Sequence, residues 1–501
     1  MKTDLERIYG YAQTQPTKPA VIHDDDIIEY GALWHKICGF SRLLSESGLQ
    51  KGEAVIVKSS RSSAHVAAYY AVQLAGGVPV ILSELMSCDA VQEVSRQYAV
   101  KWIVMDGGEH EPGVKIFSHD DVMRLADEWF REIDPVFPSL DDISEVLFSS
   151  GTTGKAKGVM ITHRNMTSVA ESCIKDMGLL EDHVSMMSNP LESVGPMREL
   201  HFTIQRGSTL VVAGSMINTA NYFGYIEKYN VTGLYMTPFA MASLFEIAPG
   251  KLAQYKDQIR IVSSAASPLP EVTRERMIET LPHSRMFHFY STTEFGLVSI
   301  MEYSSVREKK DCSGYLRDTM RVRVVDDDMR DVPDGQTGII IVQGDSVCPG
   351  YWNNPELTDA SFVDGWMLSG DVGFLDKDEY LYIVGRRDDI IIVSGYKVAP
   401  SMIEDVAMLC GLLKECVCVA HYDPKSKMEG LKMLIVPKDG MEETARKTLV
   451  RAMVKKLPEV SAENSSLIKA AVARILAIEI ISEVPRGKNG KIDRKSLRSN
   501  A

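Results

Sequence analysis

The chain has 501 residues, more than a single compact core supports, so we expect two or more domains. With 45% hydrophobic and 25% charged residues it has the composition of an ordinary globular protein, and its formal net charge of −13 argues against a nucleic-acid partner. The sequence shows no apolar leader at its start and no apolar run of about 18 residues, so we expect a cytoplasmic protein without a membrane span.

The first 140 residues alternate between strand and helix patterns. Strands are expected at 54–60, 78–82 and 101–106, with helices at 30–46 and 64–74 between and beside them. The same alternation resumes further on, with strands expected at 209–213, 233–236, 259–265 and 286–291 and helices near 220–229 and 239–245. This spacing predicts βαβ units and mainly parallel sheets, and therefore an α/β fold.

The pattern of apolar and turn-forming residues changes from about residue 320. Short apolar runs at 321–327, 338–344 and 380–386 are separated by turn-rich segments, which predicts a small antiparallel, β-barrel-like module. A last α+β unit follows, with helices expected at 401–409 and 442–456 and a hairpin that pairs 415–423 with 429–437. We place the boundary at 387–389, which gives an N-terminal domain of residues 1–386 and a C-terminal domain of residues 387–501.

Eight cysteines are scattered along the chain, and Cys416 and Cys418 stand close together within a β-branched run. The alternation of a strand puts both thiols on one face. No second pair and no histidine has the spacing of a metal site, so we expect two small buried residues there.

A loop rich in hydrogen-bond donors follows the apolar strand 145–148 and precedes the strand 159–162. Three glycines let its backbone turn tightly, and its hydroxyls and lysines can donate to phosphate oxygens. It is not a Walker A loop, because Ala156 stands where that pattern needs its second glycine. A plain hairpin loop is the alternative, and the density of donors argues against it. The candidate phosphate ligands are Ser149, Ser150, Gly151, Thr152, Thr153, Gly154, Lys155 and Lys157.

This segment resembles the phosphate loop of the adenylate-forming superfamily, which comprises acyl-CoA and aryl-CoA ligases, firefly luciferases and the adenylation domains of peptide synthetases. Ala156 stands where the family usually has a proline. Because proline would stiffen the loop, its absence should make the loop less ordered without changing the chemistry. Four further blocks match in order, so that the resemblance covers nearly the whole chain. It implies ATP, Mg²⁺ and coenzyme A, or a phosphopantetheine arm, as the molecules bound.

The block 287–296 is similar to the family motif that surrounds the nucleotide. The resemblance implies that Tyr290 flanks the adenine, with Ser291 and Thr292 beside it. It assigns Thr293 to the α-phosphate and makes Glu294 the Mg²⁺ ligand, a role that suits a hard carboxylate oxygen. Ala266 and Ser267 are assigned to the nucleotide in the same way.

The remaining blocks, 365–373, 385–400 and 485–498, extend the resemblance into the C-terminal part. Asp371 is implied to bind the ribose hydroxyls, Arg386 to lie near the ribose and phosphate, and Asp388 to be the pivot of a mobile C-terminal domain. Ile392 stands where many members have a lysine. The thiol cofactor would approach along Ser394, Gly395 and Tyr396. Lys491 would be the mobile catalytic lysine, against the alternative of a solvated basic tail.

The acid should be bound by residues within 189–207, 234–241 and 264–269. The candidates are Ser193, Val194, Arg198 and Tyr235. Ser193 stands near the position of a histidine common in CoA ligases, and Val194 stands opposite the aspartate with which amino-acid-activating domains hold an amine. This argues against an α-amino acid, although a shift of one or two residues would place Glu192 there.

Arg198 and His201 fall on one face of the expected helix. One hypothesis is that they bind a second carboxylate or a hydroxyl of the substrate. The alternative is a solvent-facing arginine with a capping or core histidine.

Three functions compete. The favoured one is ATP-dependent activation of a carboxylic acid to acyl-AMP with release of pyrophosphate, followed by transfer to the thiol of coenzyme A. The second is a stand-alone ligase that loads a separate phosphopantetheinylated carrier protein. The third is a non-enzymatic homologue that binds a nucleotide as a sensor. It is the least favoured, because the chain keeps the charged motif residues Lys157, Glu294, Asp371, Arg386 and Lys491.

Overall fold

The computed structural model describes residues 1–501 apart from 110, 133, 151–155, 215, 217, 310–311, 394–395, 424–427, 458–467, 487–491, 493 and 500–501. The chain divides into two compact units, Met1–Val322 with Val342–Met367, and Arg323–Ile341 with Leu368–Ala501. The short 3-10 helix η2 (Arg387–Asp389), where we placed the domain boundary, lies inside the second unit. That boundary stays a prediction.

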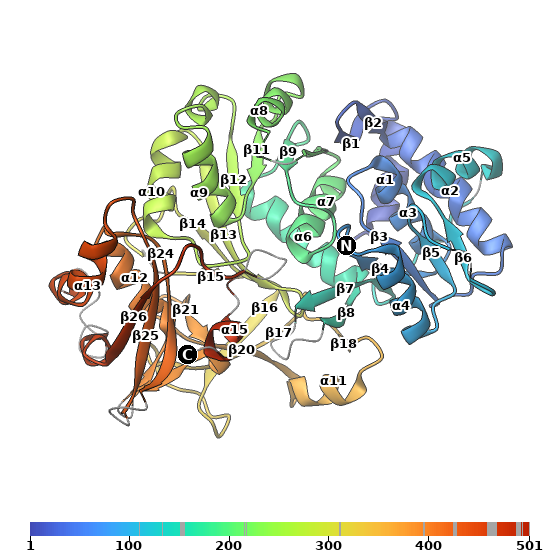
Figure 1. Ribbon diagram of the computed structural model, residues 1–501. Helices are drawn as coiled ribbons and strands as arrows, with labels where there is room; N and C mark the ends of the chain where they lie inside the picture. Colours follow the sequence, from blue (N-terminus) through green and yellow to red (C-terminus); the bar gives the residue numbers. More distant parts are fainter. Residues whose placement is uncertain are drawn as a thin grey trace. The chain divides into compact units, whose positions relative to one another are not determined.

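The first sheet of the first unit is mainly parallel, as the βαβ pattern predicts. Its central strands are runs of buried aliphatic residues because helices cover both faces. The strand order is β18 (Gly350–Tyr351), β8 (Ala156–Thr162), β7 (Ile143–Ser150), β4 (Val78–Leu82), β3 (Ala54–Lys58), β5 (Trp102–Val104) and β6 (Lys115–Phe117). Its helices are α2 (Tyr30–Glu46), α3 (Ser63–Leu74), α4 (Cys88–Tyr98) and α5 (His119–Trp129) (Figure 1).

The second sheet of this unit has a parallel centre with antiparallel strands at its margins. In this unit its strands run in the order β15 (Gly314–Leu316), β14 (Gly296–Glu302), β13 (Arg285–Thr292), β12 (Ile261–Ser264), β11 (Gly233–Tyr235), β9 (Val184–Met187), β10 (Thr209–Val212), β1 (Pro19–His23) and β2 (Asp26–Glu29). The remaining elements of the unit are α1 (Asp4–Thr14), α8 (Thr219–Lys228), α9 (Pro238–Ile247), η1 (Leu252–Tyr255), α10 (Glu271–Thr280), α11 (Pro355–Ser361) and β19 (Phe362–Val363).

Two helices, α6 (His163–Met177) and α7 (Val194–Arg206), pack against each other and connect the two sheets. Helix α6 contacts β8 and β14, whereas α7 contacts β9 and β10. A capping box between Thr162 and Asn165 starts α6 directly after β8. Gly207 ends α7 with φ +70, where a Cβ would lie 2.5 Å from the Tyr11 ring. This helix pair therefore brings the end of the donor-rich segment close to the β13–β14 region.

Four strands lie wholly or partly in the second unit, and each is hydrogen-bonded to the next in this order: β16 (Met320–Val325), β17 (Gly338–Gly344), β20 (Trp366–Leu375) and β21 (Tyr380–Arg386). Among the described residues these strands form an open row and no closed barrel. The points that divide the two units fall within β16, β17 and β20.

The C-terminal part of the second unit contains a three-stranded sheet with helices on both faces. Its elements are β22 (Ile391–Val393), β23 (Tyr396–Val398), α12 (Pro400–Leu409), β24 (Leu413–Asp423), β25 (Met428–Pro437), α13 (Glu442–Lys456), β26 (Ile475–Ile480) and α15 (Arg494–Ser499). The predicted hairpin is confirmed as β24 and β25. Cys416 and Cys418 lie in its core, and burial raises the pKa of both thiols, which confirms the expected buried pair.

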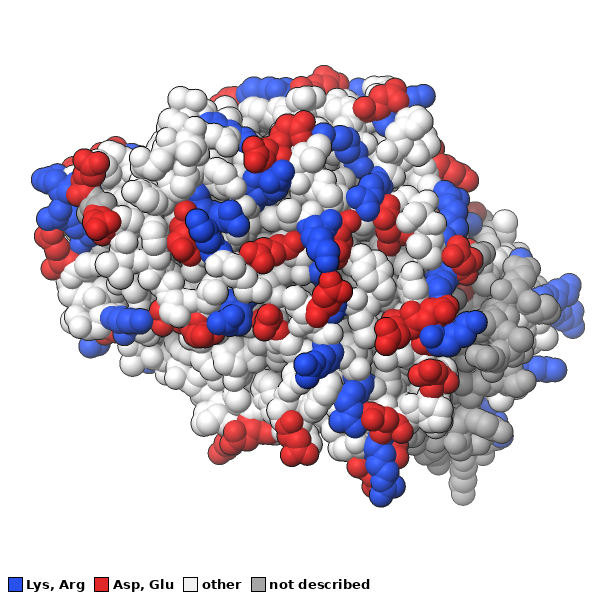
Figure 2. Space-filling view, turned by 180° about the vertical axis from the view of Figure 1, so that it is seen from behind, with Lys and Arg blue, Asp and Glu red and all other residues white. Residues whose placement is uncertain are grey.

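Two absences hold for the part of the chain that the structure describes. No helix there is both long and apolar enough to cross a bilayer. No group of three or more His, Cys, Asp or Glu side chains there could hold a metal ion. Figure 2 shows basic and acidic side chains interspersed on the face drawn.

Candidate functional site

The structure brings together two motifs that lie 145 positions apart in the sequence. Strand β7 ends at the donor-rich loop, and its Ser149 donates a hydrogen bond from Oγ to Oε1 of Glu294 at 3.2 Å. Glu294 lies in the turn between β13 and β14 and is half-buried. The predicted metal carboxylate is therefore in direct contact with the first residue of the predicted phosphate loop. Of that loop, residues 151–155 lie outside the described residues.

Tyr351 is a member of this cluster that the sequence motifs did not indicate. Its hydroxyl lies 3.4 Å from Oε1 of Glu294, and the Lys157 ammonium lies 5.7 Å from the centre of its ring. Burial and the charge of Glu294 raise the pKa of Tyr351 well above its usual range, so its hydroxyl stays a donor. Its strand, β18, is two residues long, too short to leave a periodic pattern.

The turn that carries Thr293 and Glu294 depends on a glycine. Gly296 has φ +58, and a Cβ there would lie 2.9 Å from Cβ of Ser346. Thr292 accepts a hydrogen bond from the backbone N–H of Phe295, and the ring of Tyr290 packs against that phenylalanine at 5.6 Å. The four predicted nucleotide residues Tyr290, Ser291, Thr292 and Thr293 are thus half-buried around one tight turn.

Ala266 and Ser267, the other two residues assigned to the nucleotide, follow the carboxyl end of β12 and are exposed. Ala266 has φ +83, a left-handed backbone conformation that a residue with a Cβ adopts rarely. Strained residues of this kind gather at functional sites. The conformation is compatible with the assignment, which stays a prediction.

A small cavity lies where α6, α7 and the β13–β14 turn meet. Its volume is about 10 Å³. Two predicted acid-pocket residues, Val194 and Arg198, line it together with Ser291 and Thr293 from the predicted nucleotide motif. The candidate acid and nucleotide residues therefore line one cavity within the first unit.

Ser193 is exposed and caps α7 without a side-chain hydrogen bond, whereas Tyr235 is buried. Gly195 lets that tyrosine approach α7, since a Cβ there would lie 2.2 Å from its hydroxyl. Glu192, the alternative amine ligand, accepts hydrogen bonds from Ser83 Oγ at 2.9 Å and from the N–H of Glu84 at 2.7 Å. The carboxylate of Glu192 is hydrogen-bonded outside the cavity, whereas Val194 lines the cavity.

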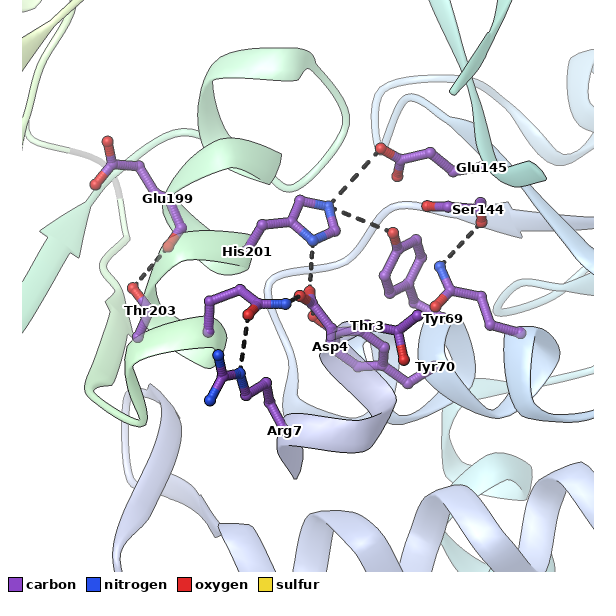
Figure 3. Close-up of polar contacts among 12 residues, drawn as sticks. Thr3, Asp4, Arg7, Tyr69, Tyr70, Ser144, Glu145, Glu199, His201 and Thr203 are labelled. Atoms are coloured by element: carbon purple, nitrogen blue, oxygen red, sulfur yellow. Dashed lines mark hydrogen bonds and ion pairs between the residues drawn. The ribbon is translucent and has the colours of Figure 1, made fainter. Parts of the chain in front are cut away.

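The structure separates Arg198 from His201. Arg198 is 1% exposed, so the alternative of a solvent-facing arginine is wrong. His201 is a core histidine: its Nδ1 lies 2.5 Å from Asp4 Oδ2 and its Nε2 3.8 Å from Glu145 Oε1. Figure 3 shows this buried cluster, with the side chain of Glu199 directed away from it. The hypothesis that both residues serve the substrate is therefore wrong for His201.

Burial alone would lower the pKa of His201. The charge of Asp4, the hydrogen bond to Asp4 and the nearby carboxylate of Glu145 outweigh that effect and raise the pKa to about 10. The imidazolium is thus charged at neutral pH and ties α7 to α1 and β7.

In the second unit, Asp371 and Arg386 lie opposite each other on β20 and β21. Arg386 Nη1 donates to Asp371 Oδ1 at 3.1 Å and to the carbonyl of Ser369 at 3.3 Å. Gly370, with φ +74, admits the guanidinium, because a Cβ there would lie 2.7 Å from Arg386 Nη2. The two residues predicted for the ribose side are brought together, whereas their contact with a nucleotide stays a prediction.

The other predicted residues of this unit are only partly described. Asp388 is exposed in η2. Ser394, Gly395 and Lys491 lie outside the described residues, and of Tyr396 only the backbone, in β23, is described.

Two contacts hold the chain on either side of residues 487–491. Arg486 and Ile492 form an isolated antiparallel bridge. Arg494 donates two hydrogen bonds to the carboxylate of Glu404, both at 2.7 Å, and a third to the carbonyl of Cys418 at 3.1 Å. Arg494 is thus tied to the second unit, and the bridge joins the described residues on the two sides of 487–491 to each other.

Residues 10–352 match the AMP-binding enzyme family, and the chain belongs to that family. This agrees with a fold and a site of the adenylate-forming class. The chain is an enzyme of the AMP-forming acid–thiol ligase class.

Its relatives include 4-coumarate–CoA ligase 1 of Petroselinum crispum, 25% identical over 485 residues that cover 91% of this chain and 86% of that protein. Feruloyl-CoA synthase of an Amycolatopsis species is 25% identical over 86% of this chain and 87% of that protein. A 4-coumarate–CoA ligase-like protein of Arabidopsis thaliana is 28% identical over 72% of this chain, which spans 62% of that protein.

Solved structures support the fold over the whole chain. ATP-bound MatB from Rhodopseudomonas palustris has a TM-score of 0.86 at 20% identity and covers 100% of this chain and 99% of its own. The anthranilate–CoA ligase AuaEII in complex with anthranoyl-AMP has a TM-score of 0.85 at 21% identity, covering 100% of this chain and 97% of its own.

Proposed function

We propose that the chain activates a carboxylic acid as its acyl-adenylate and transfers the acyl group to the thiol of coenzyme A. The contact between Ser149 and Glu294 carries this proposal, because it joins the donor-rich loop to a carboxylate suited to a phosphate-bound cation. The names of the relatives, CoA ligases and a CoA synthase, favour coenzyme A as the thiol. Loading of a carrier protein remains the alternative.

In the first step a carboxylate oxygen attacks the α-phosphorus of ATP, and pyrophosphate leaves. Two anions must approach and negative charge grows on the phosphate oxygens, so fixed donors lower the barrier. Lys157, the Thr293 hydroxyl and the loop N–H groups are the proposed donors within the first unit. The Tyr351 hydroxyl holds Glu294 in place beside them.

A Mg²⁺ ion fits the residues present, since a cation that bridges phosphates takes only one or two carboxylates from the protein. Glu294 would hold it, and the bound ion would draw charge from the phosphate oxygens.

In the second step the thiol loses its proton and attacks the acyl carbon, and AMP leaves with the bonding electron pair.

ATP–pyrophosphate exchange tests the first step across a panel of aliphatic, aromatic and dicarboxylic acids. Coenzyme A and a phosphopantetheinylated carrier protein are then offered in parallel. We expect at least one acid to give AMP and pyrophosphate, and coenzyme A to yield the acyl thioester. Formation of ADP, or no ATP cleavage with any acid, would contradict the proposal.

A further inference from the structure

Arg198 carries a positive charge in the interior of the first unit. It is 1% exposed, on a helix whose residues from Gly195 to Gln205 are all buried. None of its three guanidinium nitrogens makes a hydrogen bond of good geometry with a described residue, and the nearby Tyr235 hydroxyl is a neutral acceptor that leaves the charge unpaired. A guanidinium stays protonated at any physiological pH, and a buried charge without hydrogen bonds is unfavourable. The site therefore lacks a charged acceptor.

The aromatic neighbours of Arg198 compensate only part of this charge. Its Cζ lies 4.3 Å from the centre of the Phe289 ring and 5.5 Å from that of Tyr235. Ring faces attract a cation but accept none of its N–H groups in the ring plane. The rings therefore attract the guanidinium, but they supply no negatively charged acceptor for its N–H groups.

The adjacent carboxylate does not fill the gap. Oε1 of Glu199 lies 3.9 Å from Arg198 Nη2, too far for a hydrogen bond. The same carboxylate accepts hydrogen bonds from Ser185 at 2.9 Å and Ser263 at 3.2 Å. Burial raises the pKa of Glu199 to about 7 against the opposing effect of Arg198, so it is only partly ionised near neutral pH.

Arg198 lines the same cavity as Thr293, the residue proposed for the α-phosphate. Between them the wall is largely apolar, with Met166 and Val169 from α6 and Leu297 from β14. The nucleotide phosphates have proposed cations elsewhere, in the loop and at Lys491. Arg198 is therefore a cation on the acid side of the cavity.

We infer that Arg198 forms a subsite for a second carboxylate, and that the preferred substrate is a dicarboxylic acid. This rests on the proposed function. One carboxylate lies toward Thr293 and reacts, while the other receives two parallel hydrogen bonds from the guanidinium fork. The apolar wall contacts the carbons between them.

The test compares dicarboxylic acids of about three to eight carbons with their monomethyl esters and with monocarboxylic acids of equal length, by ATP–pyrophosphate exchange on the full chain. Each ester keeps the reacting carboxylate and the length but removes the second charge. We expect kcat/KM for the preferred diacid to exceed that for its ester about 10²–10⁴-fold, because the ester leaves a buried donor unpaired. This comparison needs no variant.

Arg198→Met, similar in length and apolar, should lower kcat/KM for the diacid about 10²-fold or more while monocarboxylic acids are activated as well as before or better. Arg206→Met, at the half-exposed end of the same helix, is the matched control and should leave the preference unchanged. Arg198→Lys keeps the charge and is the variant to measure if Arg198→Met does not fold.

Three results would overturn the inference. Equal activation of diacids, esters and monoacids would remove the subsite and leave the proposed function standing. An equal loss with every acid in Arg198→Met would place Arg198 at the reacting group or in the core. No ATP cleavage with any acid would instead remove the proposed function, and the subsite with it.

Discussion

The carboxylate of Glu294 is positioned by a tight turn and by hydroxyl groups from distant parts of the chain. Ser149 and Tyr351 both reach Oε1, from strands β7 and β18. The backbone carbonyl of Glu294 accepts a further hydrogen bond from the N–H of Cys348 at 2.8 Å. The side chain is therefore oriented before any ligand binds, which is the condition for electrostatic catalysis without a reorganisation cost.

Glu294→Gln should lower the rate of acyl-adenylate formation about 10²–10³-fold, because the amide keeps the shape but loses the charge that holds a cation. Steady-state pyrophosphate release at saturating ATP measures this, with a Mg²⁺ titration to locate the loss. Glu279→Gln changes an exposed carboxylate and should leave the rate unchanged. Full activity of Glu294→Gln would exclude the metal role.

Helix α7 shows where sequence patterns stop being informative. That Arg198 and His201 lie on a helix was predicted, and the predicted bounds of α2 and α13 are those of the structure. The burial of Arg198 was not predictable, because every residue of α7 after Val194 up to Gln205 is buried and the helix has no solvent face. The Asp4 that pairs with His201 lies 197 positions earlier, and no local period relates the two.

The cluster around His201 joins three elements, α1, α7 and β7. Removing one member of a buried ion pair leaves the other charge uncompensated, so His201→Gln should cost about 3–5 kcal/mol of unfolding free energy. His35→Gln is the matched control: its pair with Asp127 is partly exposed, and the loss should be about 0–1 kcal/mol. Urea unfolding of each variant measures the difference.

The contribution of His201 should also depend on pH. Its pKa in the folded chain, about 10, is above the ordinary value of 6.5. The stabilisation is therefore fully present below pH 6.5 and is lost as the pH rises toward 10. The gap in unfolding free energy between the native chain and His201→Gln should be larger at pH 6 than at pH 9.5. A gap that widens with rising pH would contradict the assignment.

At the scale of the whole molecule, the candidate residues are distributed over two units. Thr293, Glu294 and the acid cavity belong to the first, whereas Asp371, Arg386 and the segment around Lys491 belong to the second. The sequence motifs indicated both sets. Motif order carries no information about the angle between compact units, so the arrangement of the two sets in space could not be predicted from the sequence.

Lys491→Ala should abolish acyl-adenylate formation while transfer from a supplied acyl-adenylate to coenzyme A continues at a similar rate. The proposed reason is that the lysine stabilises charge on the phosphates in the first step and is absent from the second. Pyrophosphate exchange and thioester formation, measured separately, check this. Equal loss in both would show that the lysine serves a single closed state.

The ion pair between Glu404 and Arg494 has a consequence for how such a lysine could act. The pair ties Arg494 to α12, and the bridge joins Arg486 to Ile492, so the described residues on both sides of 487–491 are part of the second unit. If Lys491 serves the first half-reaction, we expect its approach to a phosphate to follow rotation of this unit as one body, and an insertion after residue 491 should leave the order of the two half-reactions unchanged.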